Sequence, residues 1–140
     1  MEITANALQT VASNQNVIFT DTVTCGNCSI SYREGSGLIT LKGVTSCQCR
    51  ARFKVSFGGN IAIPTGGTVE AISLALAIDG EPVQTTTMTV TPAAVENFFN
   101  VFSAIFIDVP RNCCFTVSVR NINTQSIEVE NANLIIERVA

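Results

Sequence analysis

The sequence predicts a single all-β domain, a sandwich or barrel of about nine to ten short strands spanning residues 1–140. Three observations support this prediction. Apolar and polar residues alternate with period two in several segments, as in half-buried strands. Turns rich in glycine and asparagine separate these segments. No segment between them has the length and pattern of a crossover helix, which points to a sandwich or barrel.

The first part of the chain is predicted to consist of short strands joined by polar turns. Residues 8–11 and 17–22 are expected to form two strands around the polar turn at residues 13–16. The glycine-rich turn at residues 34–37 precedes a further strand at residues 38–41. Gly, Asn and Ser favour turns because they tolerate unusual backbone angles or bond their own backbone.

The clearest alternation lies at residues 49–57, where one face of the predicted strand is apolar and the other is basic. The apolar face is expected to be buried, and the basic face to be exposed to solvent. The apolar set is Cys49, Ala51, Phe53, Val55 and Phe57, and the opposite set is Arg50, Arg52, Lys54 and Ser56.

The predicted strand at residues 69–78 has bulky residues on one face and small residues on the other. The bulky set is Ile72, Leu74, Leu76 and Ile78, and the small set is Ala71, Ser73, Ala75 and Ala77. Either another layer approaches the small face closely, or that face is an ordinary surface. The dipeptide at residues 79–80 is Asp-Gly, which is typical of a tight hairpin, so residues 83–90 are expected to return antiparallel.

Residues 91–110 fit both a helix and a strand. Thr91-Pro92 resembles a helix start, whereas β-branched and aromatic residues favour a strand. We therefore expect at most one helical turn, followed by a long strand that is apolar on both faces. Residues 127–139 are likewise apolar on both faces near their end.

A second apolar face on a strand needs a neighbour that a small sandwich does not supply. A three-fold axis between copies of the chain would bury it. The residues expected at such a trimer interface are Phe98, Phe102, Phe106, Leu134 and Ile136.

The six cysteines are grouped in pairs, Cys25-x-x-Cys28, Cys47-x-Cys49 and Cys113-Cys114. Three outcomes remain open: disulfides formed after release from the reducing cytoplasm, a metal site, and thiols that merely pack. Four thiolates suit tetrahedral zinc, and a zinc site would use Cys25, Cys28, Cys47 and Cys49. An intervening hairpin would bring these two pairs to one end of the sandwich, so we expect a crosslink or a metal to join them.

The charge pattern argues against several function classes. The net charge is −3 and histidine is absent, which disfavours nucleic-acid binding and removes the commonest general base. No coherent nucleophile–base set is visible, so no enzyme activity is expected. Glu128 and Glu130 share one predicted strand face; a solvated face is favoured over a cation site. No signal peptide or membrane span is apparent, which predicts synthesis in the cytoplasm.

Several segments resemble known families. Residues 7–11 with 16–19, and the ending at residues 133–139, resemble the first and last strands of the TNF/C1q-like jelly roll. Residues 61–64 and the following strand are similar to C-terminal domains of collagen-like spore-surface glycoproteins. The turn at 33–37, the segment 91–96 and the pair Cys113-Cys114 resemble small virion-surface proteins of tailed phages and prophages of gut Firmicutes.

This resemblance implies a jelly roll that assembles as a homotrimer on a virion surface. The implied role is a capsid decoration or head-fibre protein that binds the major capsid protein or another part of the particle. Two alternatives are a self-assembling subunit or tip of a bacterial or spore surface appendage, and a carbohydrate- or receptor-binding module. The resemblance supplies no catalytic residues.

Overall fold

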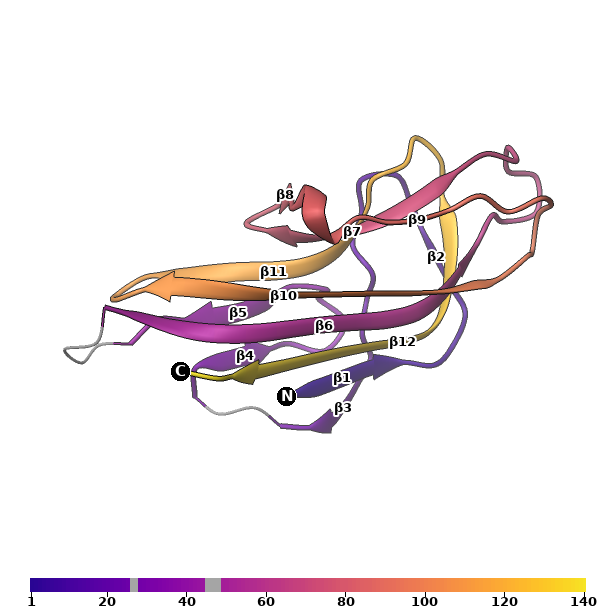
Figure 1. The fold of residues 1–140 in the computed structure, drawn as a ribbon. Coiled ribbons are helices and arrows are strands. Elements are labelled where there is room, and N and C mark those ends of the chain that lie inside the picture. Colours follow the sequence, from indigo (N-terminus) through magenta and orange to yellow (C-terminus); the bar gives the residue numbers. More distant parts are fainter. Residues whose placement is uncertain (26–27, 45–48) are drawn as a thin grey trace.

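A computed structural model describes residues 1–25, 28–44 and 49–140 of the chain. Within these residues the chain forms twelve strands and one turn of 3-10 helix, arranged as two six-stranded sheets (Figure 1). The predicted all-β sandwich is confirmed. No helix in this part of the chain has the length and apolar character needed to cross a membrane.

Sheet 1 has the strand order β10-β6-β12-β1-β3, and β2 pairs with β12 outside this path. All of its strand pairs are antiparallel. Its long strands, β6, β10 and β12, run along the length of the molecule (Figure 1). The bounds are β1 Glu2–Ala5, β2 Gln9–Val11, β3 Asp21–Thr24, β6 Arg50–Ala62, β10 Phe99–Pro110 and β12 Ile127–Arg138.

Sheet 2 has the order β4-β5-β11-β7-β8, and β9 pairs with β7. Its pairs are also antiparallel. The bounds are β4 Ile30–Tyr32, β5 Ile39–Lys42, β7 Ile72–Ile78, β8 Glu81–Pro82, β9 Met88–Val90 and β11 Cys114–Asn121, with the 3-10 turn η1 at Gln84–Thr86.

The core lies between the sheets, and β6 supplies its largest side chains. Ala51, Phe53, Val55 and Phe57 are all fully buried, as the alternation predicts. The ring of Phe19 meets the ring of Phe57 edge-on, with 6.4 Å between the centroids. Tyr32, the only tyrosine, donates its hydroxyl to the carbonyl of Phe19 at 2.5 Å. The aromatic residues of the core are therefore held by a hydrogen bond to the backbone as well as by ring packing.

Two strand predictions near these residues are displaced. The strand expected at residues 17–22 begins only at Asp21. Val17 and Phe19 are still fully buried, because this segment bridges the sheets and the amide of Val17 bonds the carbonyl of Val119 at 2.8 Å. Cys49 precedes β6 and is exposed, so it does not share the buried face of that strand.

The chain itself covers part of the predicted small-residue face of β7, whereas Ala71, just before the strand, is exposed and Ser73 is half-buried. Ala75 and Ala77 are fully buried, and the hydroxyl of Thr86 in η1 accepts a bond from the amide of Leu76 at 3.0 Å. The Asp79-Gly80 hairpin is confirmed, with φ of 51° and 85°. The strand expected at residues 83–90 is interrupted by η1, and within it only β9 pairs antiparallel with β7. Residues 91–96 form turns rather than a helical turn, and β10 begins at Phe99.

Candidate functional site

The outer face of sheet 1 carries an apolar patch that the core does not absorb. Phe102 and Phe106 of β10 are 67% and 62% exposed. Ala104, also exposed, lies between them on the same face, and Ile135 of β12 is 42% exposed. Pairing places Ala104 opposite Ser56 and Ser56 opposite Ile135, so these side chains lie in one row across three strands. We call this surface the assembly face.

Not all of the predicted interface residues lie on this face. Phe102 and Phe106 do, and Phe98 is half-buried just before β10. Leu134 and Ile136 are instead fully buried in the core. A bulge between Glu130 and Asn133 reverses the alternation of β12. Even-numbered residues therefore point inward after the bulge, and Ile135 takes the outer position.

One end of the assembly face is basic and well paired. Arg50, Arg52 and Lys54 lie on the outer face of β6, as predicted. The Nε atom of Arg52 lies 2.8 Å from Oδ1 of Asp108, and Nε of Arg50 lies 3.3 Å from its Oδ2. The hydrogen bond from Arg52 holds the pKa of Asp108 below its ordinary value. The side chains of Arg50, Arg52 and Asp108 remain exposed to solvent. Ion pairs in water contribute little to the free energy of unfolding.

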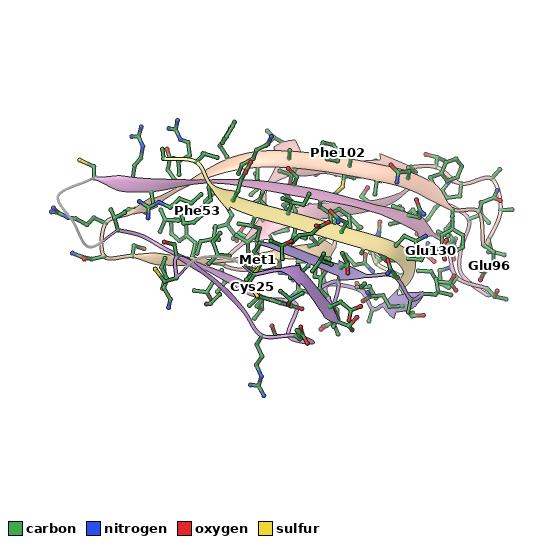
Figure 2. All side chains as sticks on the ribbon, turned by 90° about the horizontal axis from the view of Figure 1, so that it is seen from below. Met1, Cys25, Phe53, Glu96, Phe102 and Glu130 are labelled. Carbon is green, nitrogen blue, oxygen red and sulfur yellow. The ribbon has the colours of Figure 1, made fainter. Side chains whose placement is uncertain are left out.

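The other end of the same face is acidic. The parity of its strand predicts a solvated position for Glu128, but this residue is only 8% exposed. Burial raises the pKa of Glu128, and the nearby carboxyl groups of Glu96 and Glu130 raise it further. Figure 2 shows Glu96 and Glu130 together toward one end of the molecule. No sequence pattern indicates that Glu96, from the segment before β10, comes near Glu128.

The opposite edge of sheet 1 offers a second apolar surface. Leu8 and Ile18 are both exposed large apolar residues. They line, with Ala5, Gln9 and other residues, a hollow of about 300 Å³. The side chain of Gln9 holds Ile18 in place, donating to its carbonyl at 2.8 Å and accepting from its amide at 3.0 Å. Glu2 and Asp21 give this edge acidic character.

Among the described cysteines, Cys28, Cys49 and Cys113 lie on loops at one end of the sandwich, and Cys114 begins β11. The segment before β4, the segment between β5 and β6, and the turn between β10 and β11 meet there through backbone bonds. The amide of Lys42 bonds Ser29 at 2.8 Å, that of Gly43 bonds Cys113 at 2.8 Å, and that of Arg111 bonds Cys49 at 3.1 Å. The predicted hairpin brings the first two segments together; the sequence pattern does not predict the third.

The chemistry of these cysteines stays a prediction. Cys25, Cys28, Cys49, Cys113 and Cys114 are exposed free thiols, and Cys47 lies outside the described residues. Among the described residues, no three His, Cys, Asp or Glu side chains stand together in a way that could hold a metal ion. The four-cysteine zinc site includes Cys47, so this finding does not test it.

Comparison with known proteins shows the fold. No protein-family model matches the sequence, and no curated protein matches it. The globular domain of the zebrafish complement 1qA protein is similar in structure, with a TM-score of 0.61 and 13% identity over 96% of this chain and 93% of that one. The chain therefore has the C1q-like jelly-roll fold that its terminal strands resemble.

Two further structures are similar only at a lower level. The first is the C-terminal domain of EclA, a sugar-binding protein, with a TM-score of 0.40 and 13% identity over 94% of this chain and 79% of that one. The second is the family 35 carbohydrate-binding module of Abf62 from Cellvibrio japonicus, with a TM-score of 0.40 and 12% identity over 100% of this chain and 99% of that one. Scores this low support no conclusion about ligands.

Proposed function

We propose that this chain is a non-enzymatic structural module that assembles as a homotrimer through the assembly face and decorates a virion surface. The observation that carries the proposal is the exposure of Phe102 and Phe106 on a rigid strand. Apolar patches rimmed by polar residues typically mark interaction sites, and aromatic residues are enriched in the buried centres of interfaces.

The proposed occupant of the face is a second copy of the chain. A ring of copies needs two different, complementary surfaces on each molecule. Sheet 1 has an aromatic edge at β10 and an apolar hollow near its opposite edge. The charges are also complementary. Arg50, Arg52 and Lys54 leave the first edge with a net positive charge even after pairing with Asp108, and Glu2 and Asp21 lie at the second edge.

Sedimentation would test the assembly. We expect a trimer at micromolar concentration for the wild type, and a folded monomer for the double variant Phe102→Asp, Phe106→Asp. Burying two unpaired charges per copy costs several kcal/mol. Val69→Asp is a matched control, since Val69 is exposed but lies outside sheet 1, and it should remain trimeric. A monomeric wild type, or a trimeric double variant, would contradict the proposal.

The virion role rests on the sequence resemblance and needs its own test. Immunogold electron microscopy of purified phage particles should label the capsid surface or its fibres, where the partner is the major capsid protein or a neighbouring surface. Labelling found on cells or spores and not on particles would favour the bacterial or spore appendage instead. Specific binding on a glycan array would favour the carbohydrate-binding alternative.

A further inference from the structure

A buried carboxyl group lies at the acidic end of the assembly face. Glu128 pairs with Ala62 on β6 and with Thr10 on β2, so its side chain is on the outer side of sheet 1. Its Oε2 atom is buried and has no hydrogen-bond partner among the described residues. An ionised carboxylate without a partner is strongly unfavourable in such a place.

Among the described residues, the charged groups that raise the pKa of Glu128 are carboxyl groups, those of Glu96 and Glu130. Glu96 approaches from the segment before β10 and is held there firmly. Its amide bonds the carbonyl of Ile63 at 2.8 Å, and its Oε1 accepts from the amide and hydroxyl of Thr65 at 3.1 and 2.8 Å. Glu130 follows on the same strand face.

In the part of the chain that the structure describes, the positions paired with Glu128 on the neighbouring strands bring no compensating charge. β6 presents Ala62 and Asn60 at the neighbouring positions, and β2 presents Thr10. The basic residues of β6 lie at the opposite end of the face. Two carboxyl groups that are close together, and lack a cation, can satisfy one another by holding a single proton between them.

We propose that Glu96 and Glu128 share one proton, and that this pair makes the acidic end of the assembly face a pH-sensitive switch. The raised pKa of Glu128 agrees with this arrangement. Because the pKa in the folded chain lies above the ordinary value of 4.5, the stabilisation is complete below that pH. It is lost as the pH rises through the folded pKa.

The size of the effect follows from proton linkage. Between the unfolded and folded pKa values of Glu128, the ratio of folded to unfolded chains should fall about tenfold for each pH unit.

A second consequence, which rests on the proposed function, concerns assembly. Glu130 lies in one row with Asn60 and Asn100, and Phe102 lies in the next outward-facing row. Loss of the proton adds negative charge where copies would approach, so assembly should weaken as well.

The test compares urea unfolding midpoints of the wild type and Glu128→Gln from about pH 5 to pH 9. The amide keeps the shape of the acid and cannot ionise. We expect the wild type to lose stability relative to this variant as the pH rises, and Glu96→Gln to behave as Glu128→Gln does. Glu34→Gln, in an exposed turn, should follow the wild type. A constant difference between wild type and Glu128→Gln across this range would overturn the proposal.

Two further measurements distinguish proton sharing from cation binding and from an effect of assembly. If millimolar Ca²⁺ at high pH restores the wild-type midpoint and leaves Glu128→Gln unchanged, the carboxyl groups form a cation site and proton sharing is wrong. Sedimentation of the same samples reports assembly independently. A wild type that is monomeric at every pH would refute the proposed function, while its unfolding midpoints would still decide whether the pair holds a proton.

Discussion

Two pairs of phenylalanines on neighbouring strands of sheet 1 have opposite surroundings. Phe53 and Phe57 of β6 are fully buried, whereas Phe102 and Phe106 of β10 are mostly exposed. Phe57 pairs with Ser103 and Phe102 pairs with Gly58, so a shift of one residue separates the inner aromatics from the outer ones. The difference shows that the period of a strand defines its two faces, while the second sheet decides which face becomes the core.

The largest expected effect is on the inner pair. Phe57→Ala should lower the free energy of unfolding by about 3–5 kcal/mol, because it leaves a cavity in a closely packed core. Phe102→Ala should change it by less than about 1 kcal/mol, because most of that ring is already in water. Urea unfolding followed by circular dichroism, at a dilution where the chains are monomeric, gives both values. Equal losses would mean that the two pairs do not differ as their exposure indicates.

Two adjacent glycines sharpen the same comparison. A Cβ at Gly59 would lie 3.2 Å from the buried ring of Phe57 and 3.4 Å from Cα of Ala132. Gly59→Ala should therefore cost about 1–3 kcal/mol by overpacking. A Cβ at Gly58 would lie 3.9 Å from Phe102, an ordinary contact. Gly58→Ala should be neutral, or should stabilise by about 0.4–1 kcal/mol through the unfolded chain. Thermal unfolding of the two variants side by side would reveal a reversed order if the faces were misassigned.

The smallest effect is expected at the basic end of the outer face. The hydrogen bond from Arg52 lowers the pKa of Asp108 from 3.8, so its contribution to stability is present above that pH. It is lost as the pH falls through the folded pKa. Asp108→Asn should therefore differ slightly from the wild type at pH 7 and by less at a pH well below 3.8. Unfolding midpoints at the two pH values measure this, and a larger difference in acid would have the wrong sign.

Features that depend on nearby residues could be predicted from the sequence. The faces of β6 and the Asp79-Gly80 hairpin follow from local alternation and turn chemistry, and both are confirmed. The inward positions of Leu134 and Ile136 could not be predicted, because the bulge in β12 is defined by its pairing with β6. A register shift of this kind leaves no local pattern in the strand that contains it.

Features that depend on distant contacts could not be predicted either. Glu128 has the outward parity of a solvated residue but is only 8% exposed, and the carboxyl group of Glu96, distant in sequence, comes near enough to raise its pKa. The turn carrying Cys113 reaches the other cysteine segments through the strand order of sheet 2, which brings β11 beside β5. The spacing of residues in the sequence does not show which distant segments become neighbours. In this protein the order of the strands in each sheet determines those neighbours.

The position of β10 at the end of its sheet also bears on how the protein can be handled. Among the described strands of sheet 1, this strand has one hydrogen-bonded neighbour, β6, and its other edge is unpaired. It is twelve residues long and carries three exposed aromatic rings, those of Phe99, Phe102 and Phe106. Long apolar edge strands are templates for aggregation. If copies assemble as proposed, a subunit made in excess of its partners would precipitate through this edge, and its soluble yield would depend on the rate of assembly during expression.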